Sequence, residues 1–339
     1  MTARAGLSRG SEHARARLRG LRVIVDGSVT DEFTDALEQL VPEGDDVGRF
    51  VHRALAEPTG VPKLNVVVLR HGEPVLATTL RARQRRWEPA TTTVAPTLGM
   101  PHRDGLLEPA LSALCLPILI QDYFGDAKTD FRRQKLKPFD SYIARLRDFD
   151  YEAYWRSTRS WNMIRRAQRQ TAELTVVHDD PSTLAWAIDT WEARWTGDPS
   201  DEVGAAPDLR IIWPALLRTP ALMTTVLVSP EGTPLAGNVN LVDGDTLVGL
   251  ISARDTDLPT SQGSIGTRAE LECWDAARAV GLEKRDLGGY HEYKRRLTPP
   301  GRVAYEVEVE PRIIAPDRIA RARRLAGKAK RKLQRLAGR

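Results

Sequence analysis

The sequence predicts an α/β (α+β) protein with two similar halves, each a mixed sheet flanked by helices. Its 339 residues exceed one typical domain and fit two domains of about 150 residues. Strand-like and helical runs alternate through most of the chain. Residues 72–80 and 232–241 share Gly-x-Pro, a following Ala and a β-rich continuation, at an offset of about 160 residues. We interpret this repeat as a duplicated domain, with chance similarity between two hairpins as the alternative.

The first half is expected to begin with a flexible, Arg-rich arm over residues 1–20. Two apolar, β-rich runs around the turn HGEP predict a hairpin. A buried helix is expected over 105–124, and Pro117 should kink or end it. The other predicted helices are 31–40 and 47–56, and the predicted strands are 21–25, 64–70, 75–81 and 91–98.

The second half follows a polar connector at 125–138. A three-stranded meander is the clearest element, because the link DGD at 243–245 is a strong hairpin signal. A Gly/Ser loop then leads into a helix for which Gly281 is the expected C-cap. The predicted helices are 139–146, 151–171, 182–195, 210–218 and 267–280, and the predicted strands are 174–178, 224–229, 235–243, 246–254, 283–288 and 304–310.

Composition and charge narrow the class of protein. Hydrophobic residues make up 41% and charged residues 28%, which permits a packed core. Two cysteines, Cys115 and Cys273, cannot form a disulfide framework, so we expect small core residues in a reducing cytoplasm. Neither a secretory signal nor a membrane-spanning stretch is visible. The net charge of +5 is uneven, because residues 317–339 carry about +9 and the remainder about −4.

The loop before helix 267–280 is the first candidate for ligand binding. Gly263 and Gly266 flank a helix start, where free backbone N–H groups and the helix dipole suit a phosphate or pyrophosphate. The spacing matches neither a P-loop nor a dinucleotide-binding fingerprint. Many helices begin after Gly and Ser, so an ordinary helix start is the alternative.

The order of these elements resembles the GNAT acyltransferase superfamily. The resemblance rests on the meander with AGN at 236–238, the loop into a helix ending AxxxG, and the block DLGGYHEYKRRL at 286–297. It is most similar to the branch with FemAB-like peptidyltransferases and BioF2-like (CelD-like) acetyltransferases, which carry D-[LF]-G-x-G…YK late in the chain. The resemblance covers about 139–310, and residues 21–138 join it only through the weak repeat.

The resemblance implies tandem GNAT-like domains with the chemistry in the second. The expected boundaries are a basic arm at 1–20, domains at 21–138 and 139–315, and a basic helical tail at 316–339. It also implies acetyl-CoA or another acyl-CoA as donor, with no metal. The implied cofactor-binding residues are Gln262, Gly263, Ser264, Ile265, Gly266 and Thr267. This loop departs from the common pattern [RQ]-x-x-G-x-[GA], which leaves the donor type open between acyl-CoA and aminoacyl-tRNA.

Acyl transfer to an amine needs a base, an acid for the leaving thiolate and a donor to the carbonyl oxygen. The candidate side chains are His291 as base, Tyr293 as general acid, Lys294 as partner of phosphates or a substrate carboxylate, and Asp286 as base or strand-end cap. The alternatives are a loop histidine without a task and a solvated lysine.

Two basic segments suggest anionic partners. Arg159, Arg165, Arg166 and Arg169 gather near one face of a predicted helix, where a solvated face is the alternative to contact with an anionic substrate or nucleic acid. The tail from Ile319 repeats small apolar residues in steps of three and four among Lys and Arg. We expect it to attract an anionic membrane or RNA, or else to be a solvated helix.

The predicted function is N-acyl transfer, with acetyl as the expected group, from acyl-CoA to an amine on a sugar, amino acid or cell-envelope intermediate. The location is expected to be cytoplasmic and peripheral to the membrane. The alternatives are a FemAB-like aminoacyl-tRNA-dependent peptidyltransferase and a catalytically inert GNAT-fold binding protein.

Overall fold

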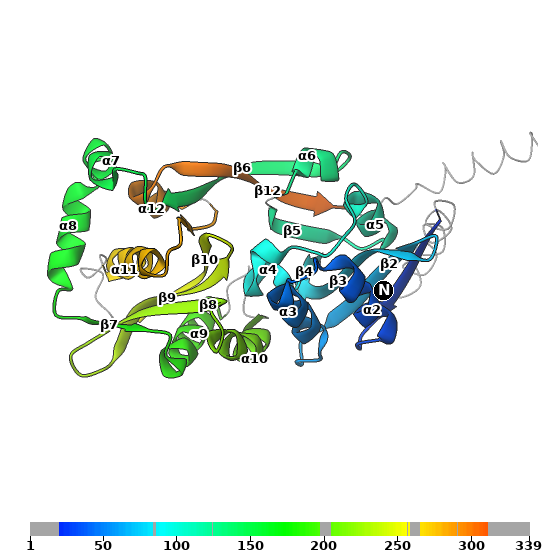
Figure 1. Cartoon of the computed structure of the whole chain (residues 1–339), viewed down its shortest axis with the longest axis horizontal. Coiled ribbons are helices and arrows are strands. Elements are labelled where there is room, and N and C mark those ends of the chain that lie inside the picture. The colour runs from blue at the N-terminus through cyan, green and yellow to red at the C-terminus, as the bar shows by residue number, and fades with distance from the viewer. Residues whose placement is uncertain are drawn as a thin grey trace, which may run out of the picture.

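The computed structural model describes residues 20–83, 86–123, 125–196, 205–255, 257, 265–289 and 291–310. Within them, a 12-stranded mixed sheet runs through the molecule in the order β1-β2-β3-β4-β5-β12-β6-β11-β10-β9-β8-β7. Figure 1 shows the two ends of this sheet as two lobes, which are joined along one side by β6 and β12. The expected basic arm and basic tail lie outside the described residues, apart from Gly20.

The elements of the first lobe come from the first half of the chain. They are β1 (Leu21–Asp26), α2 (Asp31–Leu40), α3 (Asp46–Ala56), β2 (Lys63–Arg70), β3 (Glu73–Arg83), β4 (Arg86–Pro89), α4 (Thr91–Val94), η1 (Pro96–Leu98), α5 (Leu107–Ala113), β5 (Ile118–Tyr123), α6 (Ala127–Asp130) and β6 (Lys135–Arg145). Two further helices, α7 (Tyr151–Ser157) and α8 (Trp161–Gln170), lead to the second lobe.

The second lobe repeats this order. Its elements are β7 (Thr175–His178), α9 (Pro181–Trp195), α10 (Ala206–Leu217), β8 (Leu222–Val228), β9 (Pro234–Asp243), β10 (Thr246–Arg254), α11 (Ile265–Ala279), β11 (Lys284–Asp286), α12 (Glu292–Leu297) and β12 (Pro300–Val309). In both lobes two helices separate the first two strands, which is the pattern expected of a duplicated unit.

Strand pairing confirms that the fold has two equivalent halves. Strands β1 to β4 pair antiparallel in chain order, and β4 then pairs parallel with β5. Strands β7 to β10 and β11 pair in the same sequence of directions. The repeated segments 72–80 and 232–241 lie in β3 and β9, the third strand of each half.

The last strand of each half completes the sheet of the other half. Strand β6 pairs with β11 of the second lobe, and β12 pairs with β5 of the first lobe. At the centre β6 and β12 pair with each other, from Tyr142 opposite Pro300 to Lys135 opposite Glu308. The expected boundary between residues 138 and 139 therefore falls inside β6, a strand that belongs to both lobes.

Local signals fix the helix ends. Asp180 accepts hydrogen bonds from the N–H groups of Ser182 and Thr183 at 3.0 and 2.9 Å, and Pro181 occupies the first turn of α9. Gly281, with φ of 86°, follows α11 in the left-handed conformation expected of a C-cap. These ends, the hairpin, the meander and helices α2 and α3 agree with the sequence-based expectations.

The expected helix over 139–146 is wrong, because these residues form most of β6. The buried residues Tyr142, Ala144 and Leu146 recur with a period of two, and pairing on both sides outweighs their helix propensity.

The region 91–124 also differs from expectation. Residues 91–98 form α4 and η1 instead of a strand, and the strand β4 precedes them. Helix α5 ends at Ala113, because Cys115 takes a φ of 59° and Pro117 follows, after which the chain turns into β5. Cys115 is thus a half-buried turn residue, whereas Cys273 is buried in α11 as expected.

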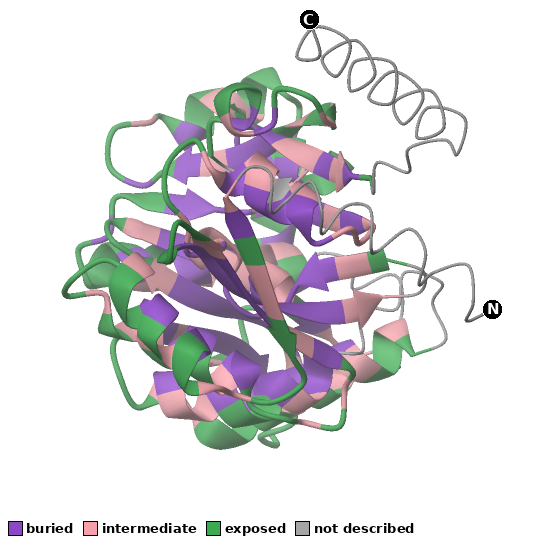
Figure 2. Cartoon of the chain, turned by 90° about the vertical axis from the view of Figure 1, so that its right-hand side faces the viewer, coloured by how far each residue is buried: buried purple, intermediate pink, exposed green. Residues whose placement is uncertain are grey.

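A shared interior joins the lobes. Val51 and Leu55 of α3 lie in one apolar cluster with Leu209 and Trp213 of α10, and the Trp213 indole donates to the Val94 carbonyl at 3.1 Å. Figure 2 shows these layers, with buried strands inside and exposed outer helix faces. Lys63 of β2 contacts Asp208 of α10 at 2.5 Å, and 3% and 0% of their side chains are exposed. The lobes are therefore held together by apolar packing and a buried ion pair.

Lys63→Met should destabilise the protein by about 3–5 kcal/mol, because it leaves the Asp208 carboxylate buried without its cation. The matched control is Lys137→Met, because Lys137 is exposed, its half-buried partner Glu306 lies 3.4 Å away, and the loss of this surface pair should cost no more than about 1 kcal/mol. Urea unfolding of both variants measures the difference, and equal losses would contradict the inter-lobe role of the pair.

Ending the chain after residue 299 should unfold both lobes, since it removes β12 from the middle of the sheet. Ending it after residue 316 keeps every described strand, so this control should keep the thermal midpoint of the full chain. Circular dichroism melts of the two truncated proteins check the expectation, and a folded protein without β12 would refute it.

Candidate active site

Strands β10 and β11 of the second lobe part after a short stretch of pairing, and we call the unpaired edge of β10 beyond that stretch the cleft. The two strands are paired in parallel only from Thr246 and Lys284 to Val248 and Asp286. Strand β11 ends there, while β10 continues to Arg254 with a bulge at Leu250, between Gly249 and Ile251. Beyond Val248, no described strand pairs with this edge of β10. Backbone groups of β10 can therefore face a ligand.

Arg285 fills the foot of this cleft. Its guanidinium makes a bidentate pair with Glu270 of α11, at 2.7 and 3.1 Å, and donates to the carbonyls of Leu247 and Asp286 at 3.3 and 3.0 Å. A Cβ at Gly249 would lie 2.8 Å from the Arg285 Nη1 atom, so a side chain there would displace the guanidinium. Burial opposes its charge, but Glu270 outweighs this and raises the pKa of Arg285.

Polar side chains continue along the sheet face that α11 covers. Ser252, exposed on β10, donates to Asn238 Oδ1 at 2.6 Å, and the Asn238 amide donates to the Cys273 sulfur at 3.4 Å. Burial raises the pKa of Cys273 to about 11. The thiol is therefore neutral near pH 7 and is not the nucleophile of a covalent mechanism.

The expected donor loop is only partly described. Gln262, Gly263 and Ser264 lie outside the described residues, whereas Ile265, Gly266 and Thr267 form the first turn of α11. Ile265 is buried and anchors this turn, while Gly266 is exposed with open space around its Cβ direction. The first turn of any α-helix has N–H groups without a partner inside the helix, and the binding of a phosphate at the start of α11 stays a prediction.

Asp286 lies at the junction of the exchanged strands. Its carboxylate accepts from the Gly288 N–H at 2.8 Å and the Ser141 hydroxyl at 3.5 Å, and it forms an ion pair with Arg302 of β12. Because the side chain is buried and its oxygens contact β6 and β12, these contacts favour a positioning role over that of a base.

The other three candidates lie together at α12, a short helix that the sequence analysis did not anticipate, because His291 directly precedes it and Tyr293 and Lys294 belong to it. Lys294 is buried and donates to the Gly289 carbonyl at 2.8 Å, while the rings of His291 and Tyr293 stack at 6.0 Å between centroids. Partial burial and the charges of Lys294 and Arg194 lower the pKa of His291. Burial, together with Glu270, raises the pKa of Tyr293 to about 12 although 47% of the residue is exposed, so it is protonated at neutral pH.

The sequence analysis missed the buried groups Glu270, Arg285 and Asn238. One signal was available, since Glu270 interrupts the apolar face of α11 beside Ala269, Cys273, Trp274 and Ala277. A buried carboxylate at such a position requires a buried cation. The identity of that cation depended on the pairing of β11.

In the first lobe, the equivalent place holds a network of buried charges. Strands β4 and β5 share a single pair, Trp87 with Ile118, and the short helices α4, η1 and α5 lie between them in the chain, where the second lobe has α11. Buried Glu88 pairs with Arg81 and Arg83, and Arg83 also donates to Gln121 at 2.7 Å. This network joins β3, β4 and β5, whereas in the described part of the second lobe β10 keeps an unpaired edge beside the 15-residue α11.

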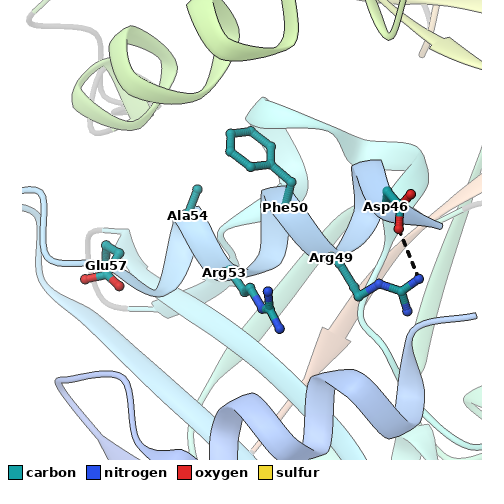
Figure 3. Close-up of a pocket in the computed structure, with 6 residues that line it drawn as sticks. All are labelled: Asp46, Arg49, Phe50, Arg53, Ala54 and Glu57. Atoms are coloured by element: carbon teal, nitrogen blue, oxygen red, sulfur yellow. Dashed lines mark hydrogen bonds and ion pairs between the residues drawn. The ribbon is translucent and has the colours of Figure 1, made fainter. Parts of the chain in front are cut away.

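A hollow of about 410 Å³ on the first lobe is a different feature. All the residues that line it belong to α3 or directly follow it, and Figure 3 shows Phe50 and Ala54 on one side of the helix with Arg49 and Arg53 on the other. Since one surface helix supplies every lining residue, this hollow brings no acid–base groups from separate elements together. We assign it no catalytic role.

Two absences hold for the residues that the structure describes. In that part of the chain, no three or more His, Cys, Asp or Glu residues gather as a metal site would require. Likewise, none of its helices is both long and apolar enough to cross a bilayer.

Comparisons with known proteins agree with this geometry. No curated protein matches the sequence. Residues 156–295 match the model of the acetyltransferase (GNAT) domain, which spans the cleft, α11 and most of α12.

Solved structures share the fold at low identity. L-PGS from Bacillus licheniformis is 10% identical with a TM-score of 0.51, covering 88% of this chain and 97% of that one. A tandem GNAT protein of the clavulanic acid biosynthesis pathway is 10% identical with a TM-score of 0.50, covering 86% and 98%. The C-terminal domain of a putative lysylphosphatidylglycerol synthetase from Agrobacterium fabrum is 11% identical with a TM-score of 0.50, covering 82% and 91%. With the repeated sheet, these matches show that the chain has the fold of a tandem GNAT protein and that its residues 156–295, in the second half, match an acetyltransferase (GNAT) domain.

Proposed function

We propose that the chain transfers an acetyl group from acetyl-CoA to an amine on a sugar, an amino acid or a cell-envelope intermediate. The observation that supports the proposal is the unpaired edge of β10 beyond its short pairing with β11, because Arg285 and Glu270 at the foot of this cleft lie close enough to Tyr293 of α12 to influence its pKa. In the proposed site, backbone donors of β10, the N-terminus of α11 and titratable side chains act together.

The donor would lie along this cleft. Its pyrophosphate would bind the N–H groups of residues 262–267, where the dipole of the 15-residue α11 adds positive charge. The thioester carbonyl would accept a hydrogen bond from the backbone of β10 near the bulge at Leu250, where no described strand competes for it. Such a donor stabilises the oxyanion as the amine attacks.

The closed foot of the cleft favours a short acyl group. Arg285 and Glu270 are buried and joined by two hydrogen bonds, and the Arg285 guanidinium lies against Gly249. A long acyl chain entering between the strands would have to break this ion pair in a buried place, at a cost of several kcal/mol. An acetyl group needs no such rearrangement.

The α12 side chains supply the two proton transfers. His291, with its lowered pKa, is neutral at pH 7 and takes the proton of the attacking amine. Tyr293, with its raised pKa, keeps its proton for the CoA thiolate when the C–S bond breaks. Lys294 would hold the Gly288–Gly289 turn through its bond to the Gly289 carbonyl, and Asp286 would fix the end of β11.

Acetyl-CoA at about 100 times its Kd should stabilise the protein by roughly 2.7 kcal/mol, whereas long-chain acyl-CoA and aminoacyl-tRNA should give smaller shifts. Gly266→Asp should weaken acetyl-CoA binding through its charge beside the phosphates. The acidic side chain itself suits the first turn of a helix, so folding should be kept. Thermal shift with each donor measures these effects.

Gly27→Asp is the matched control, since Gly27 also has open space around its Cβ direction and lies in the first lobe. If acetyl-CoA binds both variants equally, the donor placement is wrong. If no acyl-CoA binds the unaltered protein, the transferase proposal itself fails, and a shift with aminoacyl-tRNA alone would favour the peptidyltransferase.

The rate should rise with pH through the pKa of His291, which lies below its ordinary value of about 6.5. Arg194→Gln removes a positive charge that lowers this pKa, so the acidic limb of log(kcat/KM) should move to higher pH. Arg70→Gln, on an exposed residue of the first lobe, is the control and should leave the limb in place. An unmoved limb in Arg194→Gln, or one that persists in His291→Ala, would exclude His291 as the base.

A further inference from the structure

Helix α8 presents an arginine face to solvent. Its buried residues Ile164 and Ala167 mark the inner side, toward α11. At about 100° per residue, Arg165, Arg166 and Arg169 fall on the opposite side, and all three are exposed. We call Arg165, Arg166 and Arg169 the α8 arginine face. In Figure 1 α8 lies at the outer end of the second lobe, far from the first.

The charge of this face is not neutralised by nearby carboxylates. Residues 159–172 contain four Arg and neither Asp nor Glu. Among the described residues, the ion pair at Arg156–Glu152 is confined to α7, and none joins a carboxylate to the α8 arginine face. Uncompensated charge on one helix side costs stability through self-repulsion, which an anionic partner would relieve.

The side chains around the α8 arginine face bear on whether its partner is a nucleic acid or a bilayer surface. The guanidinium groups of Arg156 and Arg165 lie over the Trp161 indole, at 4.5 and 5.6 Å from its centroid, and Trp155 stacks with the same ring. This stacking covers the ring that a nucleic-acid base would need. Helices α7 and α8 also carry none of the large apolar side chains exposed in the described chain, so insertion into acyl chains is not supported. A row of cations beside an amphipathic indole suits phospholipid head groups at a bilayer surface.

We propose that the α8 arginine face docks this protein on an anionic phospholipid bilayer by electrostatic contact. The inference stands apart from the proposed chemistry, because it requires neither the donor nor the acceptor. The position of the α8 arginine face is nevertheless relevant to the proposed active site, because α8 packs against α11 and α7 packs against α12. A bilayer held by α8 would lie beside the lobe that carries the β10–β11 cleft, where a membrane-borne acceptor could reach it.

The test uses the full chain and vesicles of phosphatidylglycerol and phosphatidylcholine in a sedimentation assay at low salt. Each basic residue near an anionic surface contributes about 1 kcal/mol, so Arg165→Gln/Arg166→Gln/Arg169→Gln should weaken binding on the order of 100-fold. Gln is nearly as good a helix former as Arg, and unchanged circular dichroism melts would show that the fold is kept. Binding of the unaltered protein should fall as salt is raised and should be absent with phosphatidylcholine alone.

A charge-matched control separates the face from net charge. Arg22→Gln/Arg70→Gln/Arg132→Gln removes the same charge from exposed positions of the first lobe, and should bind the anionic vesicles like the unaltered protein. Equal binding by both triple variants, or equal losses, would overturn the docking proposal. So would a loss of binding to tRNA in the α8 variant while vesicle binding persists, which would assign the face to RNA. Loss of vesicle binding with acetyl-CoA binding intact is the expected outcome.

Discussion

The pairing of β6 with β12 is the constraint on which the rest of this structure depends. Each strand ends one half of the chain and completes the sheet of the other, so neither lobe has a full sheet without its partner. The same exchange fixes the end of β11, because Asp286 contacts Ser141 of β6 and Arg302 of β12. The end of β11 thus depends on contacts among three strands, one of which lies about 145 residues earlier in the chain.

The two halves share one architecture but differ in the extent of the buried ion-pair network beside their fourth and fifth strands. In the first lobe Glu88, Arg81 and Arg83 fill the gap beside β4, and the helix that follows has one turn. In the second lobe Arg285 and Glu270 occupy only the foot of the gap, and the 15-residue α11 follows. Both networks pair their charges, as burial requires. The difference in extent leaves a binding cleft in one lobe alone.

Sequence periodicity predicted the elements that are stabilised by contacts between residues close together in the chain. Helices α2, α3 and α9 begin at the capping residues Thr30, Asp45 and Asp180, whose side chains accept hydrogen bonds from N–H groups two or three residues later. The strands of the meander are joined by tight polar turns. Strands β6 and β5 were mistaken for helix because their short apolar runs fit either period, and long-range pairing decides between them. The sequence analysis missed helix α12 for a related reason. The helix has only six residues, and the glycine turn before it is held by the hydrogen bond from Lys294 to the Gly289 carbonyl.

The sequence by itself determined the duplicated order of elements, the match of residues 156–295 to the acetyltransferase (GNAT) domain and the segment 286–297, which holds the candidate acid–base residues. Those features depend on residues close together in the chain, where spacing and residue type are sufficient. Only the tertiary structure decided which lobe is open, that Asp286 is buried against β6 and β12, and that Arg285 pairs with Glu270. Each of these depends on strand partners that lie up to 145 residues apart, and on the low polarity of a buried site, which forces every charge to find a partner.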